Sequence, residues 1–188
     1  MLETLLACFS LVAVSELGDK TQLLAFSLAA RFRKPWPILA GILVATLANH
    51  ALAASAGSYA AGLVSTKAMS LTLGGLFIAF GFWTLKPDTL DETGEKNSYG
   101  PFLTTAALFF LAEMGDKTQF ATVALGARYA NAFLVTVGTT LGMMVTDGLA
   151  VFLGDRIAGR VQMKPIRWFA AALFFAYGVA SLVTGLIS

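Results

Sequence analysis

Charged residues and cysteine are scarce in this chain. Of its 188 residues, 13% are charged and 57% are hydrophobic, and the mean hydropathy is +0.74. A soluble domain carries about 25% charged residues, so this composition excludes an ordinary soluble protein and predicts an integral membrane protein. The single cysteine, Cys8, excludes an internal disulfide. The small net charge of +2 leads us to expect no nucleic-acid partner.

Strand-like alternation of apolar and polar residues is absent as well. Inside a bilayer every backbone N–H and C=O must be paired, which only helices and closed barrels achieve, so we predict an all-helical protein. The N-terminus has Glu3 where a signal peptide has a basic segment, and no clear cleavage site follows. We therefore expect the N-terminal apolar run to be the first transmembrane helix.

Six apolar segments are long enough to cross a bilayer. They cover about 2–30, 36–63, 68–85, 102–127, 132–153 and 166–187. Proline stops helices, and all five prolines lie in connections or at span ends: Pro35, Pro37, Pro87, Pro101 and Pro165. One long acidic connection divides the chain into a first three-helix unit at 1–86, a linker at 87–100 and a second three-helix unit at 101–188.

The two halves repeat each other at a constant offset of 97 residues. The clearest match is a seven-residue motif, E-L-G-D-K-T-Q at 16–22 and E-M-G-D-K-T-Q at 113–119. Polar and glycine matches at the same offset include Arg31/Arg128, Gly41/Gly138, Gly57/Gly154 and Lys67/Lys164. They indicate a duplicated three-span unit. Because three is odd, we expect the two units to cross the membrane in opposite orientations, as an inverted repeat.

Basic residues are divided unequally between the two ends of the predicted spans. The connections after spans one, three and five carry Arg31, Arg33, Lys34, Lys86, Lys96, Arg156, Arg160 and Lys164, with Arg167 close by. The opposite side carries only Lys67 and Arg128. The positive-inside rule then places the basic side and the linker in the cytoplasm and both termini outside.

Each copy of the motif places two acids in the middle of a span: Glu16, Asp19, Glu113 and Asp116. An ionisable side chain inside a membrane is costly and indicates a functional site. On a continuous helix, Glu16 and Asp19 would share a face. Spans one and four are longer than a bilayer requires, so each must tilt or break, and Gly18 and Gly115 are the expected break points. Inverted repeats would bring both acidic clusters together near the midplane.

Together the four carboxylates would form an oxygen-rich cation site, which is typical of hard divalent ions. Further oxygen ligands could come from Thr21, Gln22, Thr118 and Gln119. Mn²⁺ and Ca²⁺ lose their waters more readily than Mg²⁺. Four acids carry a charge of −4 and Lys20 and Lys117 return +2, so the remainder balances one divalent ion. When the ion leaves, crowded carboxylates are expected to take up protons, which predicts exchange of metal for protons.

The doubled E-x-G-D-[KR]-[TS] motif in a small six-span chain resembles the family of cation/proton exchangers that includes bacterial manganese exporters and Golgi and chloroplast Mn²⁺/Ca²⁺ transporters. The likeness covers essentially the whole chain, and neither motif departs from the family pattern. It implies Mn²⁺ or Ca²⁺ as substrate, H⁺ as counter-ion, no cofactor, no enzymatic activity, and cation ligands at the Glu and Asp of each motif. Eukaryotic relatives are longer at the N-terminus, so we expect a bacterial plasma membrane and export from the cytoplasm.

Two further ionisable residues occupy equivalent positions in spans two and five. His50 and Asp147 are interpreted as a proton relay or an extra ligand, or else as a structural pair that forms a hydrogen bond between helices. Lys20 and Lys117 are interpreted first as counter-ions of the acids. Competition with the cation for the empty site and snorkelling toward the interface are the alternatives.

Other functions fit parts of the same pattern. A passive cation channel could be lined by these acids, and a six-span exporter could carry another small cationic solute. An intramembrane hydrolase is disfavoured, because the lysines and the duplication have no role in it. At this point Mn²⁺ versus Ca²⁺ selectivity, proton stoichiometry, resting conformation and the choice between monomer and homo-oligomer stay open.

Overall fold

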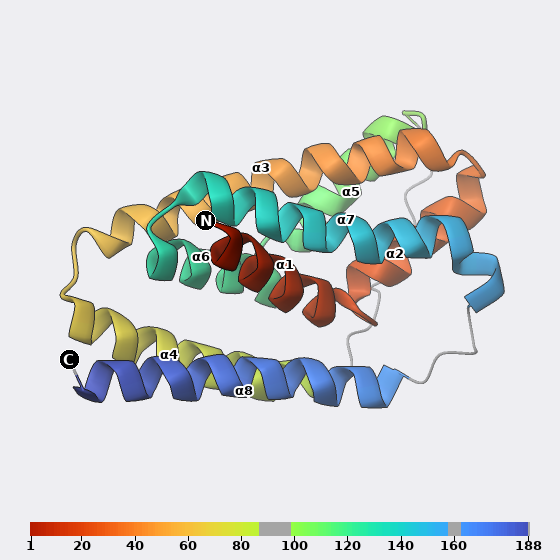
Figure 1. Cartoon of the computed structure of the whole chain (residues 1–188). Helices are drawn as coiled ribbons and strands as arrows, with labels where there is room; N and C mark the ends of the chain where they lie inside the picture. The colour runs from red at the N-terminus through yellow and green to blue at the C-terminus, as the bar shows by residue number, and fades with distance from the viewer. Residues whose placement is uncertain (87–98, 158–162, 188) are drawn as a thin grey trace.

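The described part of the chain is helical throughout. The computed structural model describes residues 1–86, 99–157 and 163–187 (Figure 1). Its helices are α1 (Leu2–Glu16), α2 (Lys20–Phe32), α3 (Pro35–Ala61), α4 (Thr66–Thr84), α5 (Pro101–Glu113), α6 (Lys117–Tyr129), α7 (Ala132–Ile157) and α8 (Met163–Ile187). The all-helical prediction is confirmed for these residues. Nearly all of the predicted linker at 87–100 lies outside them, as do Lys96 and Arg160.

Two of the predicted spans are interrupted by short turns. Residues 17–19 separate α1 from α2, and residues 114–116 separate α5 from α6. Gly18 and Gly115 adopt φ angles of 81° and 78° in these turns. This left-handed backbone is open to glycine but costs other residues about 1–2 kcal/mol. The two expected break points are confirmed.

The turns change the geometry of the motif. Glu16 is the last residue of α1, whereas Asp19 is the N-cap of α2. In the second copy, Glu113 ends α5 and Asp116 occupies the N-cap position of α6. The prediction that Glu16 and Asp19 share one helix face is therefore wrong, because the chain turns between them. Each acid instead lies at a helix end, where backbone N–H or C=O groups lack partners within the helix.

Four of the described helices are long and apolar enough by themselves to cross a membrane. They are Pro35–Ala61, Thr66–Thr84, Ala132–Phe152 and Trp168–Ile187. Large apolar side chains such as Leu52 and Phe133 are exposed on these helices, as expected of surfaces that face lipid. The first and fourth predicted spans are instead divided between two short helices each. A topology with six crossings requires that α1–α2 and α5–α6 each make one crossing.

Helices of the first half pack on helices of the second half. The long helices α3 and α7 run antiparallel to each other (Figure 1). Along them, α1 packs on α7, α5 and α6 pack on α3, and α2 packs on α7, while α4 and α8 pair at one side of the bundle. Each of these contacts joins residues before the linker to residues after it. The interrupted helices are thereby held against the two long antiparallel helices.

Glycines allow this close packing. A Cβ atom added to Gly41 of α3 would lie 2.7 Å from the carbonyl oxygen of Phe102 in α5. A Cβ atom added to Gly57 of α3 would lie 2.0 Å from the carbonyl oxygen of Val123 in α6. Gly138 makes the equivalent close contact between α7 and α1. Small residues at these positions let helix backbones approach as membrane helices commonly do.

Candidate functional site

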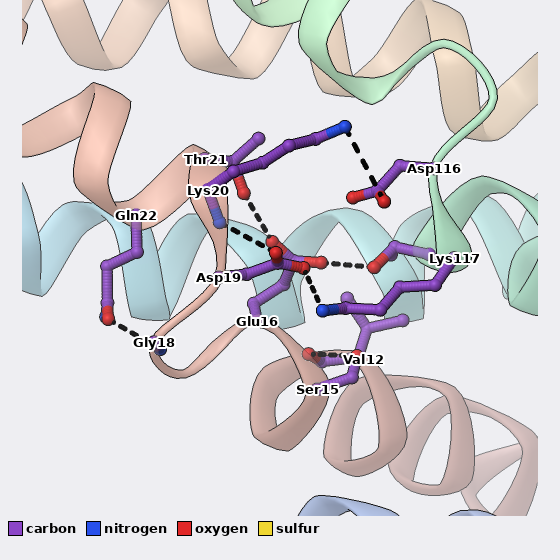
Figure 2. Close-up of polar contacts among 11 residues, drawn as sticks. Val12, Ser15, Glu16, Gly18, Asp19, Lys20, Thr21, Gln22, Asp116 and Lys117 are labelled. Carbon is purple, nitrogen blue, oxygen red and sulfur yellow. Dashed lines mark hydrogen bonds and ion pairs between the residues drawn. The ribbon is translucent and has the colours of Figure 1, made fainter. Parts of the chain in front are cut away.

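The two interrupted segments meet inside the bundle through ion pairs that cross between the halves. Nζ of Lys117 lies 2.9 Å from Oδ2 of Asp19, and Nζ of Lys20 lies 3.6 Å from Oδ1 of Asp116 (Figure 2). The two pairs correspond to each other under the 97-residue offset. The structure thus brings these four side chains of the two motif copies together.

All four acids of the motifs are buried. None is more than 4% exposed: Glu16, Asp19, Glu113 and Asp116. The Glu113 carboxyl lies within electrostatic range of the other three carboxyls and of Asp147. Lys117 is nearly as buried as the acids, whereas 28% of the Lys20 side chain is exposed. The acids therefore face the protein interior and form one buried acidic group.

In each motif the glutamine side chain forms a hydrogen bond across the turn between the two helices. The backbone N–H of Gly18 donates to Oε1 of Gln22 at 2.8 Å, and the N–H of Gly115 donates to Oε1 of Gln119 at 2.7 Å. The glutamine Nε2 groups then reach the long helices. Gln22 donates to the Thr146 carbonyl in α7 at 3.3 Å, and Gln119 donates to Asn49 Oδ1 in α3 at 3.4 Å. These glutamines position the turns, and their use as ligands stays a prediction.

The two glutamates have different surroundings although their motifs match. Glu16 accepts a hydrogen bond from Thr21 Oγ1 at 2.7 Å and another from Thr118 Oγ1 of the other half. Neither carboxylate oxygen of Glu113 has a hydrogen-bond partner among the described residues. Both threonine hydroxyls therefore serve one glutamate, and the repeat symmetry is broken at this point.

His50 and Asp147 are buried on the two long helices, where the structure does not pair them. Thr46 of α3 donates a hydrogen bond to Sδ of Met143 of α7 at 3.2 Å, and these two residues mark where the helices cross. His50 and Asp147 follow them by one turn each. Because α3 and α7 are antiparallel, the two lie on opposite sides of the crossing (Figure 1). Neither side chain has a hydrogen-bond partner among the described residues.

The donor set suits a hard divalent cation, although its aspartates are engaged by lysines. Carboxylate and hydroxyl oxygens are the ligands that Mn²⁺ and Ca²⁺ take in proteins. In the described part of the chain, no three His, Cys, Asp or Glu side chains converge closely enough to ligate one ion. Asp19 faces Lys117 and Asp116 faces Lys20, so the aspartates are neutralised by ammonium groups in this arrangement. The assignment of the four acids as ligands stays a prediction.

Sequence reasoning missed the contribution of the long helices around the motifs. Asn49 Nδ2 donates to the Phe110 carbonyl at 3.1 Å, and the same side chain accepts from Gln119. Asn49 thereby ties α3 to α5 and α6. The signal was a polar amide in an apolar span next to His50, but the sequence alone does not show which helix it contacts.

The chain matches a known family along almost its whole length. The family model described as "Divalent cation/proton antiporter GDT1" matches it twice, over residues 4–92 and 101–187. No solved structure matches the chain.

Several proteins are similar to the chain over most of their length. A "Putative manganese exporter" of Vibrio cholerae is 46% identical over 171 residues, which cover 90% of this chain and 86% of that protein. "GDT1-like protein sll0615" of Synechocystis is 32% identical over 203 residues, or 96% of this chain and 97% of that protein. "GDT1-like protein 3" of Oryza sativa subsp. indica is 30% identical over 208 residues, or 96% and 74%.

These matches agree with the resemblance that the doubled motif carries. The prediction of an integral membrane protein of a bacterial plasma membrane is confirmed, since the Vibrio relative is bacterial and the described helices include four able to span a membrane. With both halves matched by the family model and relatives above 30% identity, the chain belongs to the GDT1 family of divalent cation/proton antiporters.

Proposed function

We propose that the protein exports Mn²⁺ from the cytoplasm in exchange for protons, with Ca²⁺ as a second substrate. The observation that carries this proposal is the buried cross-pairing of two acidic motifs, in which Lys117 meets Asp19 and Lys20 meets Asp116. A buried carboxylate is costly unless it is compensated by a cation or a proton. The same acids can therefore be neutralised in turn by lysine, metal or proton, which is the requirement for exchange.

A change of partners at the aspartates accounts for metal binding. As a divalent ion arrives, the ammonium groups of Lys20 and Lys117 withdraw and the carboxylates of the two motifs turn to the metal. The four acids and two lysines carry a net charge of −2, so one divalent ion makes the site neutral. When the metal leaves, protons and the lysines restore neutrality. The Glu16 and Glu113 carboxyls, which take no part in the two lysine–aspartate ion pairs, are the proposed proton carriers.

Alternating access between two inverted three-helix repeats would expose this site to each side in turn. The double match of the family model and the corresponding breaks at Gly18 and Gly115 support a duplicated unit. The antiparallel course of α3 and α7 supports opposite orientation of the two units (Figure 1). In this topology α1–α2 and α5–α6 each make one crossing, and both termini lie outside by the positive-inside rule.

His50 and Asp147 are proposed to pass protons on opposite sides of the site. The positions of these residues on either side of the crossing of α3 and α7 support this proposal, in which each residue would serve one membrane surface. A test compares proton flux with metal binding in Asp147→Asn and His50→Gln. Both variants should bind Mn²⁺ as the parent does, while proton flux falls at least about tenfold. This is a conservative expectation, because a positioned proton-transfer group typically contributes about 100-fold or more to a rate. Unchanged flux in both would remove the relay.

Metal-driven proton flux in liposomes tests the main proposal. Given only a pH gradient, the parent protein should move Mn²⁺ uphill, whereas a passive channel can only let it run downhill. Asp19→Asn and Asp116→Asn should nearly abolish flux. Glu3→Gln removes an exposed acid outside the motifs and should leave it intact. Downhill transport alone would support a channel, and transport of basic amino acids without competition by Mn²⁺ would support another exporter.

A further inference from the structure

A second site lies outside the acidic group, where α2 ends and α3 begins. A pocket of about 550 Å³ opens there between the α2–α3 turn and α7. Its lining combines two basic residues, Arg33 and Lys34, with apolar side chains that include Phe26, Val151 and Phe152. None of the described lining residues is an acid. A pocket with cations beside apolar walls fits a ligand that has an anionic head and an apolar tail.

The two cations are available to such a ligand. Arg33 and Lys34 are exposed, and neither forms an ion pair with a described residue. Their charge would repel Mn²⁺ or Ca²⁺, so this pocket does not suit the entry of the transported cation. It is therefore a separate site, whatever the acidic motifs bind.

The aromatic side chains beside the pocket are of the kind found at the level of lipid headgroups. Trp36, which is 73% exposed, packs edge-on against Phe152 with the ring centroids 5.7 Å apart. Tryptophan is enriched where the bilayer meets water, because its ring is apolar and its N–H is polar. Phe152 lines the pocket, so Trp36 lies next to it, and we expect the pocket to lie at the depth of lipid phosphates.

The second half of the chain shows that the fold of this turn does not require the cations. Arg33 and its equivalent, Ala130, both adopt a left-handed backbone, with φ of 51° and 48°. The equivalent of Lys34 is Asn131, whose Oδ1 accepts a hydrogen bond from Leu134 N at 3.0 Å and caps α7. Lys34 stands at the N-cap of α3 and makes no such bond. A cation at a helix N-terminus is also electrostatically unfavourable.

The first half therefore keeps a locally unfavourable residue where the second half has a good cap. A residue that is unfavourable for local structure is expected where function requires it. The N-terminus of α3, with Arg33 and Lys34 beside it, would bind an anion. Basic pockets between transmembrane helices suit anionic lipid headgroups. We propose that this pocket binds an anionic phospholipid, with its phosphate at Arg33 and Lys34 and an acyl chain against Phe26 and Phe152.

A variant that copies the second half tests the proposal. Arg33→Ala with Lys34→Asn reproduces the Ala130–Asn131 turn, so the backbone is expected to fold as before. The full chain would be purified in a neutral detergent, and retention of phosphatidylglycerol against phosphatidylcholine would be measured by native mass spectrometry. The parent should retain phosphatidylglycerol preferentially. The double variant should lose about 25-fold in affinity, since each removed cation is worth about fivefold near a membrane surface.

The control removes two exposed cations elsewhere. Lys67→Ala with Lys86→Ala lowers the net charge equally and should retain the lipid as the parent does. Lys34→Asn alone serves if the double variant unfolds, and it should lose about fivefold. Equal retention in parent and variant, or no preference of the parent for the anionic lipid, would overturn the proposal. Displacement of the lipid by millimolar inorganic phosphate would also overturn it and indicate a free-anion site. Metal transport is not needed for this readout, so the result is independent of the transport proposal.

Discussion

Thr118 of the second half donates a hydrogen bond to Glu16 of the first half. The equivalent threonine, Thr21, donates to the same carboxylate and leaves Glu113 without a hydrogen bond from any described residue. Two identical motifs thus provide two chemically different glutamates. Two hydroxyl groups would stabilise a charge on Glu16, whereas a charge on Glu113 has no such support among the described residues.

This difference predicts unequal effects of removing the charge. Glu16→Gln removes the charge of the acceptor and replaces one of its two oxygens by an NH2 group that cannot accept. Hydrogen bonds to charged groups are worth about 1.5–3 kcal/mol each, so the substitution should lower the free energy of unfolding. Glu113→Gln removes a buried acid without hydrogen-bond support and should leave that free energy unchanged or higher. Both should impair metal exchange. Thermal unfolding of the purified variants in detergent decides the point, and equal loss of stability in the two would contradict the asymmetry.

The two cross-pairs predict a second inequality. Lys117→Met leaves the buried Asp19 carboxylate without this ammonium, and the loss should be about 3–5 kcal/mol. Lys20→Met should cost less, because its pair is longer and Lys20 is partly exposed. Unfolding midpoints measure both. As a matched control, Asp19→Asn in the Lys117→Met background should recover part of the loss, and an additive result would show that the two residues are not coupled.

Glycine substitutions separate backbone conformation from helix packing. Gly115→Ala places a Cβ in open space but at φ 78°, so it should cost about 1–2 kcal/mol. Gly57→Ala places a Cβ 2.0 Å from the Val123 carbonyl and must push α3 from α6, so its cost should be larger. Gly75→Ala is the control, because nothing lies near its Cβ and alanine favours helix. The loss of stability should be largest for Gly57→Ala, intermediate for Gly115→Ala and smallest for Gly75→Ala. Any other order would refute the packing argument.

Metal binding should weaken as pH falls. Protons and metal compete for the same carboxylates in the proposed cycle, so the dissociation constant for Mn²⁺ should rise about tenfold per pH unit for each proton displaced. Titration calorimetry between neutral and mildly acidic pH would give the slope and hence the proton stoichiometry. Glu3→Gln should show the parent slope. An affinity independent of pH would exclude competition at the motif acids.

The sequence by itself determined the class of protein and the places where its helices break. Low charge and long apolar segments are local properties, and they led to a membrane protein of helices. Gly18 and Gly115 were found from the length of their spans, because an over-long span must yield where the backbone has most freedom. The doubled motif led to the family, which the comparisons confirmed.

Tertiary structure decided which residues meet. The offset made Lys20 equivalent to Lys117, yet only packing of one half on the other shows that each lysine pairs with the aspartate of the opposite motif. The same packing separates His50 from Asp147 and gives both threonines to Glu16. Two repeats with the same sequence adopt the same local conformation. A side chain between the repeats, however, can contact either of two equivalent residues, one in each repeat. That choice depends on distances that no sequence spacing contains.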